Sequence, residues 1–540
     1  MEMKEEDKDN FLFQKTAAQI GKENLMCLLK DNKDTAYGRK YHFSEIRDVD
    51  AYRQMVPLTD YEAYRGYIDD MIRGEKNILT VYPIVSFCQT SGTTGLSKYI
   101  PVTEEALNRY SDYLERRKNK IIRKYNGKRL FINTFRTDLE KEIESPLLFS
   151  EIYYRFLLKQ GYLDMKEYVG GKLLLFQKNA DDIFYAKVWA AMLAEDIVIM
   201  ESIFLYDQLC FFHYMEKHWE NVLKGIRNRS IPKELKISEK VRKWLLEMEV
   251  KEERLVRIEK ECRKGFEGIV WRLWPGMRLI SGISNRAYCS EDAALKKYTG
   301  NIPVNYFCYC ASECYMGTVR DDFDFSICLQ PQGAFFEFLP YSEEQNENED
   351  LKTLLADELK LGEMYEIIIT NFSGLYRYKM GDVIKVTDYQ DGCPVFEVLF
   401  RKNIALNIAG EKVGVQQIED VMASIPDYSS RVTEYCFGVS TDNIPENYIV
   451  FFSMDDQKEK QMAEMEIANL IDEALRRENA DYNDLRKLDR IGKIVAHFLN
   501  KDTYLEFMKR NGLMDGHGKP KHVSIKGFRK SEVEGVMSTI

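Results

Sequence analysis

The sequence predicts an α/β fold in two parts: a large N-terminal domain with mixed β-sheets and packed helices, and a smaller α+β domain after it. Three observations support this prediction. At 540 residues, the chain exceeds what one hydrophobic core usually supports. From about residue 268, short β-type runs separated by glycine and proline follow a long helical region. After about residue 400, strand and helix patterns start again. We therefore place the domains at residues 1–400 and 401–540.

The N-terminal part divides into blocks of different pattern. Residues 1–80 look mainly helical, and residues 81–87 are rich in β-type side chains. Apolar residues recur at helical spacing over 103–125, where Thr103 is a suitable N-cap. Aromatic and apolar residues are dense over 185–260. We interpret this last block as helical core, although such side chains can also line an apolar substrate pocket.

The C-terminal part shows strand patterns at 448–452 and 494–498 on either side of a long charged helical stretch near 457–477. Such a mixture predicts a small α+β domain. Neither an internal repeat nor a low-complexity linker is apparent, so the joint between the two domains should be short.

Composition narrows the classes of partner. The formal net charge of -10 disfavours non-specific nucleic-acid binding, which needs lysine and arginine to displace counterions. The acidic N-terminus has no apolar leader, and no apolar run reaches membrane-spanning length, so we expect a cytoplasmic protein without a membrane partner. The 11 cysteines then read as reduced thiols. Cys308, Cys310 and Cys314 have neither a nearby histidine nor a second CxxC pair, which disfavours structural zinc.

The most informative motif is the run Thr-Ser-Gly-Thr-Thr-Gly-Leu-Ser-Lys-Tyr-Ile-Pro at 90–101. Gly92 and Gly95 let the backbone bend tightly and present several amide and hydroxyl donors to one anion. The pattern is not a Walker A loop, because Ser97 rather than glycine precedes Lys98. The flanking residues predict the order strand, loop, helix, which suits a polyphosphate cradle. Alone, the run could also be a Ser/Thr/Gly surface turn.

Two later motifs complement this loop. In the run 309–313, Tyr309 can stack on a purine, Ser312 can contact a phosphate and Glu313 can hold Mg²⁺, which prefers oxygen ligands. Alone, this run could be a strand end with an incidental acid. In the run 375–383, Asp382 follows Gly381 and can accept hydrogen bonds from ribose hydroxyls, although Gly-Asp is also a common turn.

Together and in this order, the three motifs resemble the adenylate-forming superfamily that includes acyl-CoA synthetases and firefly luciferase. The closer similarity is to the auxin-responsive Gretchen Hagen family of acyl acid amido synthetases, in a bacterial-type form. Similar segments also occur at 273–276, 335–340, 401–403 and 485–494, so the resemblance covers nearly the whole chain. It implies a luciferase-like N-terminal domain and a mobile C-terminal domain.

The resemblance also implies ATP and Mg²⁺ as cofactors and assigns roles to individual residues. The phosphates would be cradled by Ser91, Gly92, Thr93, Thr94 and Gly95, with Ser97 and Lys98 at the end of the loop. Tyr309 would face adenine, Ser312 the phosphate, Glu313 the magnesium and Asp382 the ribose, with Arg401 at the hinge before the small domain. The catalytic set would be Thr93, Glu313 and a lysine of the C-terminal domain.

That lysine is the least certain residue. In Gly516-His517-Gly518-Lys519-Pro520-Lys521, the resemblance favours Lys519, but the residues after it depart from the family pattern. Lys521 stays an alternative, and so does a solvated basic tail without a catalytic role.

The implied reaction has two steps. A carboxylate attacks the α-phosphate of ATP to give an acyl adenylate and pyrophosphate, and an amine, expected to be an amino acid, then displaces AMP to form an amide. For the acid, Ser281, Gly282, Ile283 and Ser284 match a family segment near the reaction centre. An indole, jasmonate-like, benzoate-type, fatty or amino-acid-derived acid all stay open. We expect a monomer. The alternatives are a ligase that makes a thioester with coenzyme A and a nucleotide-binding regulator without catalysis.

Overall fold

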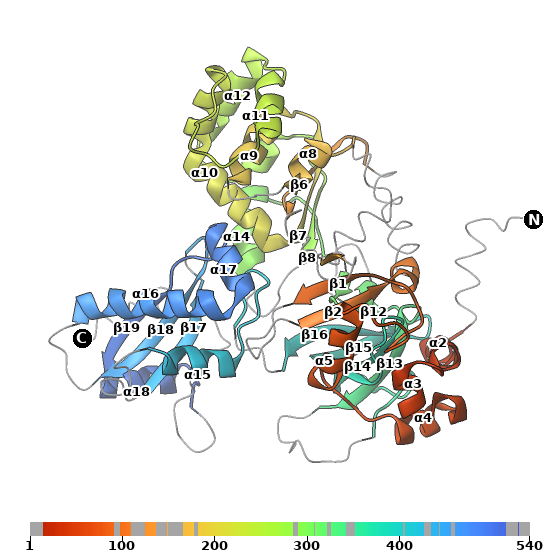
Figure 1. Ribbon diagram of the computed structural model, residues 1–540. Coiled ribbons are helices and arrows are strands. Elements are labelled where there is room, and N and C mark those ends of the chain that lie inside the picture. The colour runs from red at the N-terminus through yellow and green to blue at the C-terminus, as the bar shows by residue number, and fades with distance from the viewer. Residues whose placement is uncertain are drawn as a thin grey trace, which may run out of the picture.

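A computed structural model shows three bodies, which we name by residue: the sheet body (15–109 and 308–402), the helical body (125–136 and 166–306) and the C-terminal lobe (406–528) (Figure 1). The structure describes residues 15–90, 98–109, 125–136, 148–149, 166–177, 182–283, 290–306, 308–320, 326–341, 352–402, 406–425, 434–441, 443–454, 460–514 and 528.

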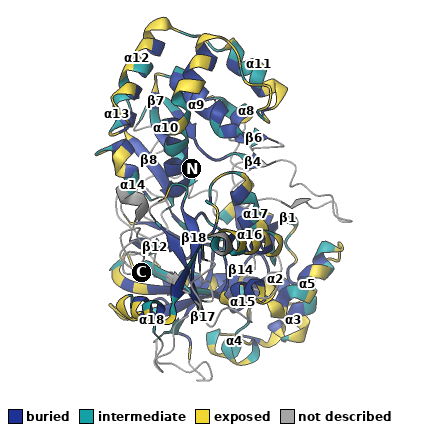
Figure 2. Cartoon of the chain, turned by 90° about the vertical axis from the view of Figure 1, so that its left-hand side faces the viewer, coloured by how far each residue is buried: buried dark blue, intermediate teal, exposed yellow. Residues whose placement is uncertain are grey.

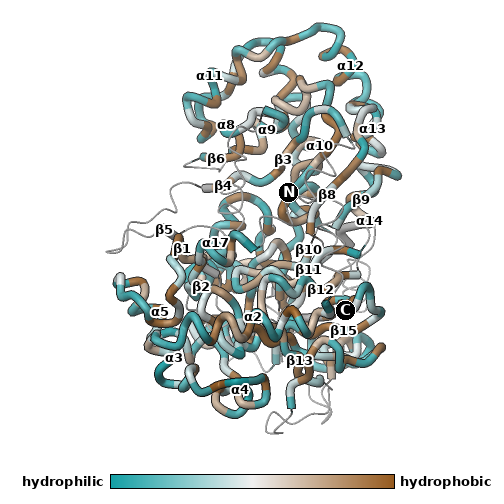
Figure 3. Tube along the Cα trace, turned by 90° about the vertical axis from the view of Figure 1, so that its right-hand side faces the viewer, coloured by the Kyte–Doolittle hydropathy of each residue, from teal (hydrophilic) through white to brown (hydrophobic). Residues whose placement is uncertain are grey.

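Helices between residues 17 and 72 cover the sheet body, in agreement with the helical pattern predicted for residues 1–80, of which 1–14 lie outside the described residues. The first of them has a capping box, in which the hydroxyl of Thr16 accepts from the backbone N–H of Gln19 and the Gln19 side chain accepts from that of Thr16. Its hydropathy alternates along the tube in Figure 3, and its apolar side packs on the sheet. The elements are α2 (Ala17–Asn32), α3 (Ala36–Lys40), η1 (Phe43–Glu45), α4 (Val49–Met55) and α5 (Glu62–Ile72).

A seven-stranded antiparallel sheet forms the centre of the sheet body, in the order β10-β11-β12-β16-β15-β14-β13. Of its inner strands, β14 is buried apart from the half-buried Met364 (Figure 2), and β15 is mostly buried as far as Val386 and more exposed beyond it. The strands are β10 (Cys308–Cys310), β11 (Tyr315–Val319), β12 (Ile327–Leu329), β13 (Ala334–Pro340), β14 (Met364–Asn371), β15 (Tyr378–Gln390) and β16 (Cys393–Arg401).

This sheet is strongly curved. Three strands separate β10 from β15, which would place the two about 19 Å apart in a flat sheet. Yet the hydroxyl of Tyr309 on β10 donates a hydrogen bond to Asp382 on β15. The curvature therefore brings together the ends of strands that are distant in the sheet order.

A second, three-stranded sheet contains β1 (Ile84–Thr90), β2 (Lys98–Thr103) and β5 (Leu148–Phe149) in the order β2-β1-β5. Strands β1 and β2 are antiparallel, and Thr90 lies opposite Lys98. The predicted order strand, loop, helix was therefore wrong in one respect, because β2 lies between the loop and the helix. Pro101 obscured this strand in the sequence, but an edge strand tolerates proline. Thr103 is the N-cap as predicted, since its hydroxyl accepts from the N–H of Ala106 at 3.1 Å.

The helical body contains a parallel sheet in the order β3-β7-β8-β9, surrounded by helices. The dense apolar block at 185–260 is mostly helical core as predicted, but residues 197–204 form a buried strand that the pattern did not separate from its neighbours. The elements are β3 (Lys128–Phe131), β4 (Phe135–Arg136), α8 (Gly171–Leu175), β6 (Phe176–Gln177), α9 (Ile183–Leu193), β7 (Ile197–Phe204), α10 (Leu205–Arg227), α11 (Glu239–Glu247), α12 (Glu252–Arg263), α13 (Ile269–Leu273), β8 (Leu279–Ile283), α14 (Ser290–Thr299) and β9 (Val304–Asn305).

The C-terminal lobe is an α+β unit with a three-stranded sheet in the order β17-β18-β19, flanked by helices (Figure 1). Phe528 packs on this sheet against Phe451 and Phe507. The elements are α15 (Val415–Ala423), β17 (Glu434–Ser440), β18 (Asn447–Met454), α16 (Lys460–Glu478), α17 (Ala480–Lys487), β19 (Val495–Asn500) and α18 (Lys501–Arg510).

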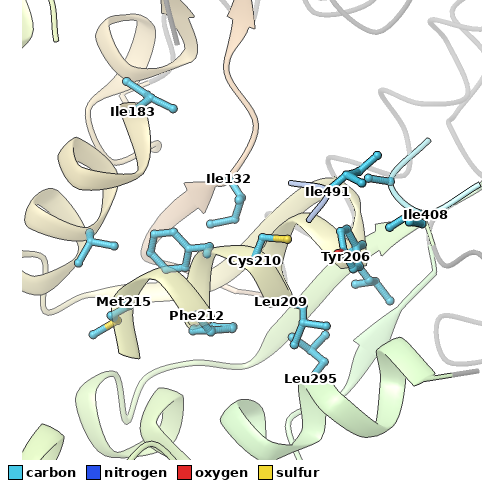
Figure 4. Packing of buried hydrophobic residues seen from close by; sticks show 14 of the residues in the cluster. Ile132, Ile183, Tyr206, Leu209, Cys210, Phe212, Met215, Leu295, Ile408 and Ile491 are labelled. Atoms are coloured by element: carbon cyan, nitrogen blue, oxygen red, sulfur yellow. The ribbon is translucent and has the colours of Figure 1, made fainter. Parts of the chain in front are cut away.

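The C-terminal lobe and the helical body share one hydrophobic core. Figure 4 shows Tyr206, Leu209 and Cys210 of α10 close to Ile408 and Ile491 of the lobe, and all five belong to the same buried cluster. The hydroxyl of Tyr206 also accepts from the backbone N–H of Glu446 at 2.6 Å. The two bodies are therefore docked through a packed interface in this conformation. Among the described residues, no helix has the length and apolar character needed to cross a membrane.

Candidate active site

The phosphate-loop residues Ser91, Gly92, Thr93, Thr94, Gly95 and Ser97 lie outside the described residues, so the position of the cradle itself is not described. The structure does describe the two ends of the loop, which leaves β1 at Thr90 and enters β2 at Lys98. Lys98 is half-buried, with its ammonium 5.4 Å from the centre of the Tyr61 ring. Burial lowers the pKa of Lys98, Arg401 acts in the same direction, and the charge of Glu313 opposes them. The lysine at the end of the loop is thus in the electrostatic field of Glu313, from the 309–313 motif, and of Arg401.

Those two motifs meet around one arginine. Arg401, at the end of β16, lies opposite Asp382 in the sheet, and its Nε is 3.4 Å from Asp382 Oδ1. Its Nη2 is 3.7 Å from Glu313 Oε1 and donates to the carbonyl of Met380 at 2.9 Å. Burial alone would lower the pKa of Arg401, but the carboxylates of Asp382 and Glu313 raise it. The structure therefore brings Glu313, Asp382 and Arg401 together, as sequence reasoning placed them in one site.

Tyr309 belongs to the same cluster through its hydroxyl. It donates to Asp382 Oδ2 at 2.5 Å, and its ring packs edge-to-face on Phe396 with the centroids 6.1 Å apart. Burial and the neighbouring Asp382 raise the pKa of Tyr309 well above its ordinary value, so it stays a donor. Ser312 is half-buried in the bend between β10 and β11 that also holds Glu313.

Glu313 fits a divalent cation. Its backbone carbonyl accepts from the side chain of Asn371 at 2.7 Å, which fixes the bend. Its Oε2 is buried and has no hydrogen-bond partner among the described residues, so this acceptor is available to a cation. Burial would raise the pKa of Glu313, but Arg401, Lys412 and Lys98 outweigh it and hold the pKa low. A buried, ionised carboxylate oxygen is the type of ligand that Mg²⁺ takes. No three His, Cys, Asp or Glu side chains within the described ranges converge as a metal site of their own.

Sequence reasoning missed Lys412, in the hairpin that follows Arg401. Burial lowers its pKa to about 8, Arg401 acts in the same direction, and Glu313 and Asp382 oppose them. These influences place its ammonium in the field of the same cluster. The sequence signal that could have indicated Lys412 is its position directly after Glu411 in the Gly410-Glu411 segment.

The hairpin itself folds around the Glu411 carboxylate. The backbone N–H groups of Ile408 and Ala409 each donate to it at 2.8 Å, and the hydroxyl of Tyr448 donates as well. Leu406 and Val413 close the hairpin with a pair of backbone hydrogen bonds. Burial raises the pKa of Glu411 to about 7.

The segment expected to face the acyl acid lies at the end of β8. Ser281 is buried, and its carbonyl accepts from the side chain of Gln208 at 2.9 Å. A Cβ on Gly282 would lie 2.9 Å from Ser202 Oγ and 3.2 Å from the backbone nitrogen of Leu205, so the close packing of α10 against this strand favours glycine. Ile283 is half-buried, and Ser284 lies outside the described residues.

The aromatic residues of 185–215 lie mostly in the core of the helical body: Trp189, Phe211 and Phe212 are fully buried. Phe204 and Tyr214 of this range are half-buried. Lys519 and Lys521 also lie outside the described residues, so the choice between them stays open.

Three domain models of one known family cover most of the chain. The GH3 family N-terminal domain matches residues 11–304, the central domain 327–401 and the C-terminal domain 416–526. Among curated proteins, a probable indole-3-acetic acid-amido synthetase GH3.1 of Oryza sativa subsp. japonica is 26% identical over 91% of this chain and 84% of its own length. A jasmonoyl–L-amino acid synthetase GH3.5 of the same organism is 24% identical over 94% of this chain and 92% of its own.

Among solved structures, a GH3.15 acyl acid amido synthetase superposes with a TM-score of 0.66 at 21% identity, over 99% of this chain and 96% of its own. That likeness supports the predicted fold class. Because the N-terminal family match alone spans more than half of the 540 residues, the chain belongs to the GH3 family.

Proposed function

We propose that this protein is an ATP-dependent acyl acid amido synthetase, which activates a carboxylic acid as its acyl adenylate and transfers the acyl group to an amino acid. The observation that carries this proposal is the convergence of Glu313, Asp382 and Arg401 beside Lys98 at the end of the Gly-Thr loop. Membership of the GH3 family and relatives named as acid-amido synthetases support the same reaction class.

In the first step, a carboxylate oxygen of the acid attacks the α-phosphorus of ATP, and the bond to the β-phosphate oxygen breaks to release pyrophosphate. The loop residues Ser91, Gly92, Thr93, Thr94 and Gly95 would hold the phosphates. Lys98, Arg401 and Lys412 would surround the developing negative charge with cations, and electrostatic stabilisation of this kind dominates phosphoryl chemistry.

Asp382 is suited to bind the ribose. Its carboxylate is already oriented by Tyr309 and Arg401, so its acceptor oxygens are preorganised for hydroxyl donors. Glu313 would hold Mg²⁺ through the buried oxygen that has no hydrogen-bond partner in the described part of the chain, and the bound ion would neutralise phosphate oxygens. Thr93, Ser312 and Lys519 keep the roles that the family resemblance implies.

In the second step, the amine nitrogen attacks the acyl carbon, the bond between that carbon and the AMP oxygen breaks, and the nitrogen loses a proton. The Ser281–Ile283 strand end would lie beside the acyl group. The substrates are thus a small carboxylic acid and an amino acid, and the identity of each is left to experiment.

The test is the exchange of labelled pyrophosphate into ATP across a library of carboxylic acids, followed by amino acids and coenzyme A on any active acid. We expect exchange that depends on the acid, and AMP release that depends on an amino acid but not on coenzyme A. Release with coenzyme A alone would instead favour the thioester ligase. ATP binding without exchange for any acid would favour a regulator.

A further inference from the structure

The start of strand β15 has an open edge that a segment of the N-terminal region fills. Among the described residues, strand β16 pairs with β15 only from Asp382 onward, so residues 377–379 do not have that neighbour. Thr59 occupies this edge: its N–H donates to the carbonyl of Arg377 at 3.1 Å, and its carbonyl accepts from the N–H of Lys379 at 2.8 Å. The chain just before helix α5 is therefore tied to the motif that ends in Asp382.

Two residues further on, Tyr61 reaches the end of the phosphate loop. Its hydroxyl accepts from the backbone N–H of Tyr99 at 2.7 Å and faces the carbonyl of the same residue at 3.4 Å. Its side chain is buried, with 2% exposure, so these contacts are made in the interior. A tyrosine hydroxyl that hydrogen-bonds both backbone groups of one residue restricts the position of that residue.

The ring of Tyr61 also lies against the side chain of Lys98, with the ammonium 5.4 Å from its centre. This is within the range of a cation–π contact. Arg65 lies 5.1 Å from the same ring, but its charge is paired with Glu62 through two hydrogen bonds of 2.8 and 2.7 Å. Lys98 therefore is the cation on this ring that keeps its charge available for a ligand.

We infer that Tyr61 is a positioning residue, which fixes the backbone at Tyr99 and thereby aims the neighbouring Lys98 at the phosphates of ATP. This inference rests on the proposed function, because it takes Lys98 as a phosphate contact. Thr59, in the same segment, is hydrogen-bonded to strand β15. Residues 59–61 therefore contact both the strand that carries Asp382 and the end of the phosphate loop.

The experiment uses the full-length protein and compares Tyr61→Phe, Tyr61→Leu, Lys98→Ala and the double variant Lys98→Ala/Tyr61→Leu. Tyr67→Phe is the matched control, because Tyr67 lies on helix α5, which Tyr61 directly precedes, and its hydroxyl accepts from the side chain of Lys40 at 3.1 Å. ATP affinity is measured by calorimetry without an acid, KM values come from pyrophosphate exchange, and thermal denaturation confirms folding.

Tyr61→Phe keeps the ring but loses the hydrogen bonds of the hydroxyl to Tyr99. We expect it to raise the ATP Kd and KM about three- to tenfold and to leave the KM for the acid unchanged. Tyr61→Leu should raise them about tenfold or more, toward the level of Lys98→Ala. The double variant should bind ATP no more weakly than Lys98→Ala, since Tyr61 acts through Lys98. Tyr67→Phe should behave as the wild type.

Wild-type ATP affinity in folded Tyr61→Leu, or additive losses in the double variant, would overturn the positioning role. Absence of exchange with every acid would overturn the proposed function instead. The calorimetric result would still decide the role of Tyr61, because it needs only ATP.

Discussion

Arg490 in the C-terminal lobe forms a buried ion pair with Asp207 on helix α10 of the helical body, and the two side chains are 11% and 1% exposed. Asp207 also accepts from the side chain of Asn133 at 2.6 Å, and that asparagine accepts in turn from the N–H of Ile203. The ion pair therefore attaches the lobe to the end of strand β7, which pairs with the strand β8 that carries the candidate acyl segment.

Removal of one partner should destabilise this interface. We expect Asp207→Ala to lower the free energy of unfolding by about 3 kcal/mol, because it leaves the Arg490 charge buried without a partner. The matched control is Asp484→Ala, whose ion pair with Lys487 is exposed and should contribute less than about 1 kcal/mol. Urea denaturation measures both, and equal small losses would contradict the structural role of the pair.

The buried Glu411 should make stability depend on pH. Its pKa is raised by burial from 4.5 to about 7, so the folded protein holds this proton where the unfolded chain has lost it. The stability that it contributes is therefore present below pH 4.5 and is lost as the pH rises through 7. The free-energy difference between wild type and Glu411→Gln should fall by about 3 kcal/mol across that window. Denaturation at pH 5, 6, 7 and 8 checks this, and a constant difference would contradict it.

Glu313 should control the requirement for magnesium. We expect Glu313→Gln to lower pyrophosphate exchange by about 10²- to 10³-fold and to raise the Mg²⁺ concentration needed for half-maximal activity. Glu363→Gln, at an exposed glutamate just before β14, is the control and should leave both unchanged. Magnesium titrations of the exchange rate measure the effect. An unchanged magnesium optimum in a folded Glu313→Gln protein would remove the metal role.

Asp382 should select for ribose hydroxyls. Wild type should prefer ATP to 2′-deoxy-ATP by about tenfold or more in KM, because a hydrogen bond to a charged group is lost. Asp382→Asn should weaken ATP binding and reduce this preference. Asp388→Asn lies on the same strand, pairs with Arg320 at 2.8 Å on the surface, and should keep it. Identical preferences in wild type and Asp382→Asn would exclude ribose recognition by this side chain.

Local sequence patterns singled out Glu313 and Asp382, because residue types in each motif suit metal or ribose, and the family resemblance added Arg401. The structure brings these three side chains together, and their roles stay predictions. The pattern of apolar residues was also enough to predict an α/β protein with a small α+β part. In both cases the information lies within a few neighbouring residues.

What the sequence could not predict depends on contacts between distant segments. Tyr61 is separated from Lys98 by 37 positions, and nothing in its local sequence indicates that they meet. Strand β2 was missed because Pro101 disfavours a strand unless the edge position is known. The interface between Asp207 and Arg490 joins residues 283 positions apart, which no local pattern reports.

The most direct test of the acyl-adenylate mechanism follows one oxygen atom. A carboxylic acid that supports exchange is labelled with ¹⁸O in its carboxylate and is incubated with the enzyme, ATP, Mg²⁺ and an amino acid, and the products are analysed by mass spectrometry. If the acid attacks the α-phosphate, each amide formed leaves one ¹⁸O atom in the AMP phosphate. Unlabelled AMP, or ¹⁸O in orthophosphate together with ADP, would contradict the account.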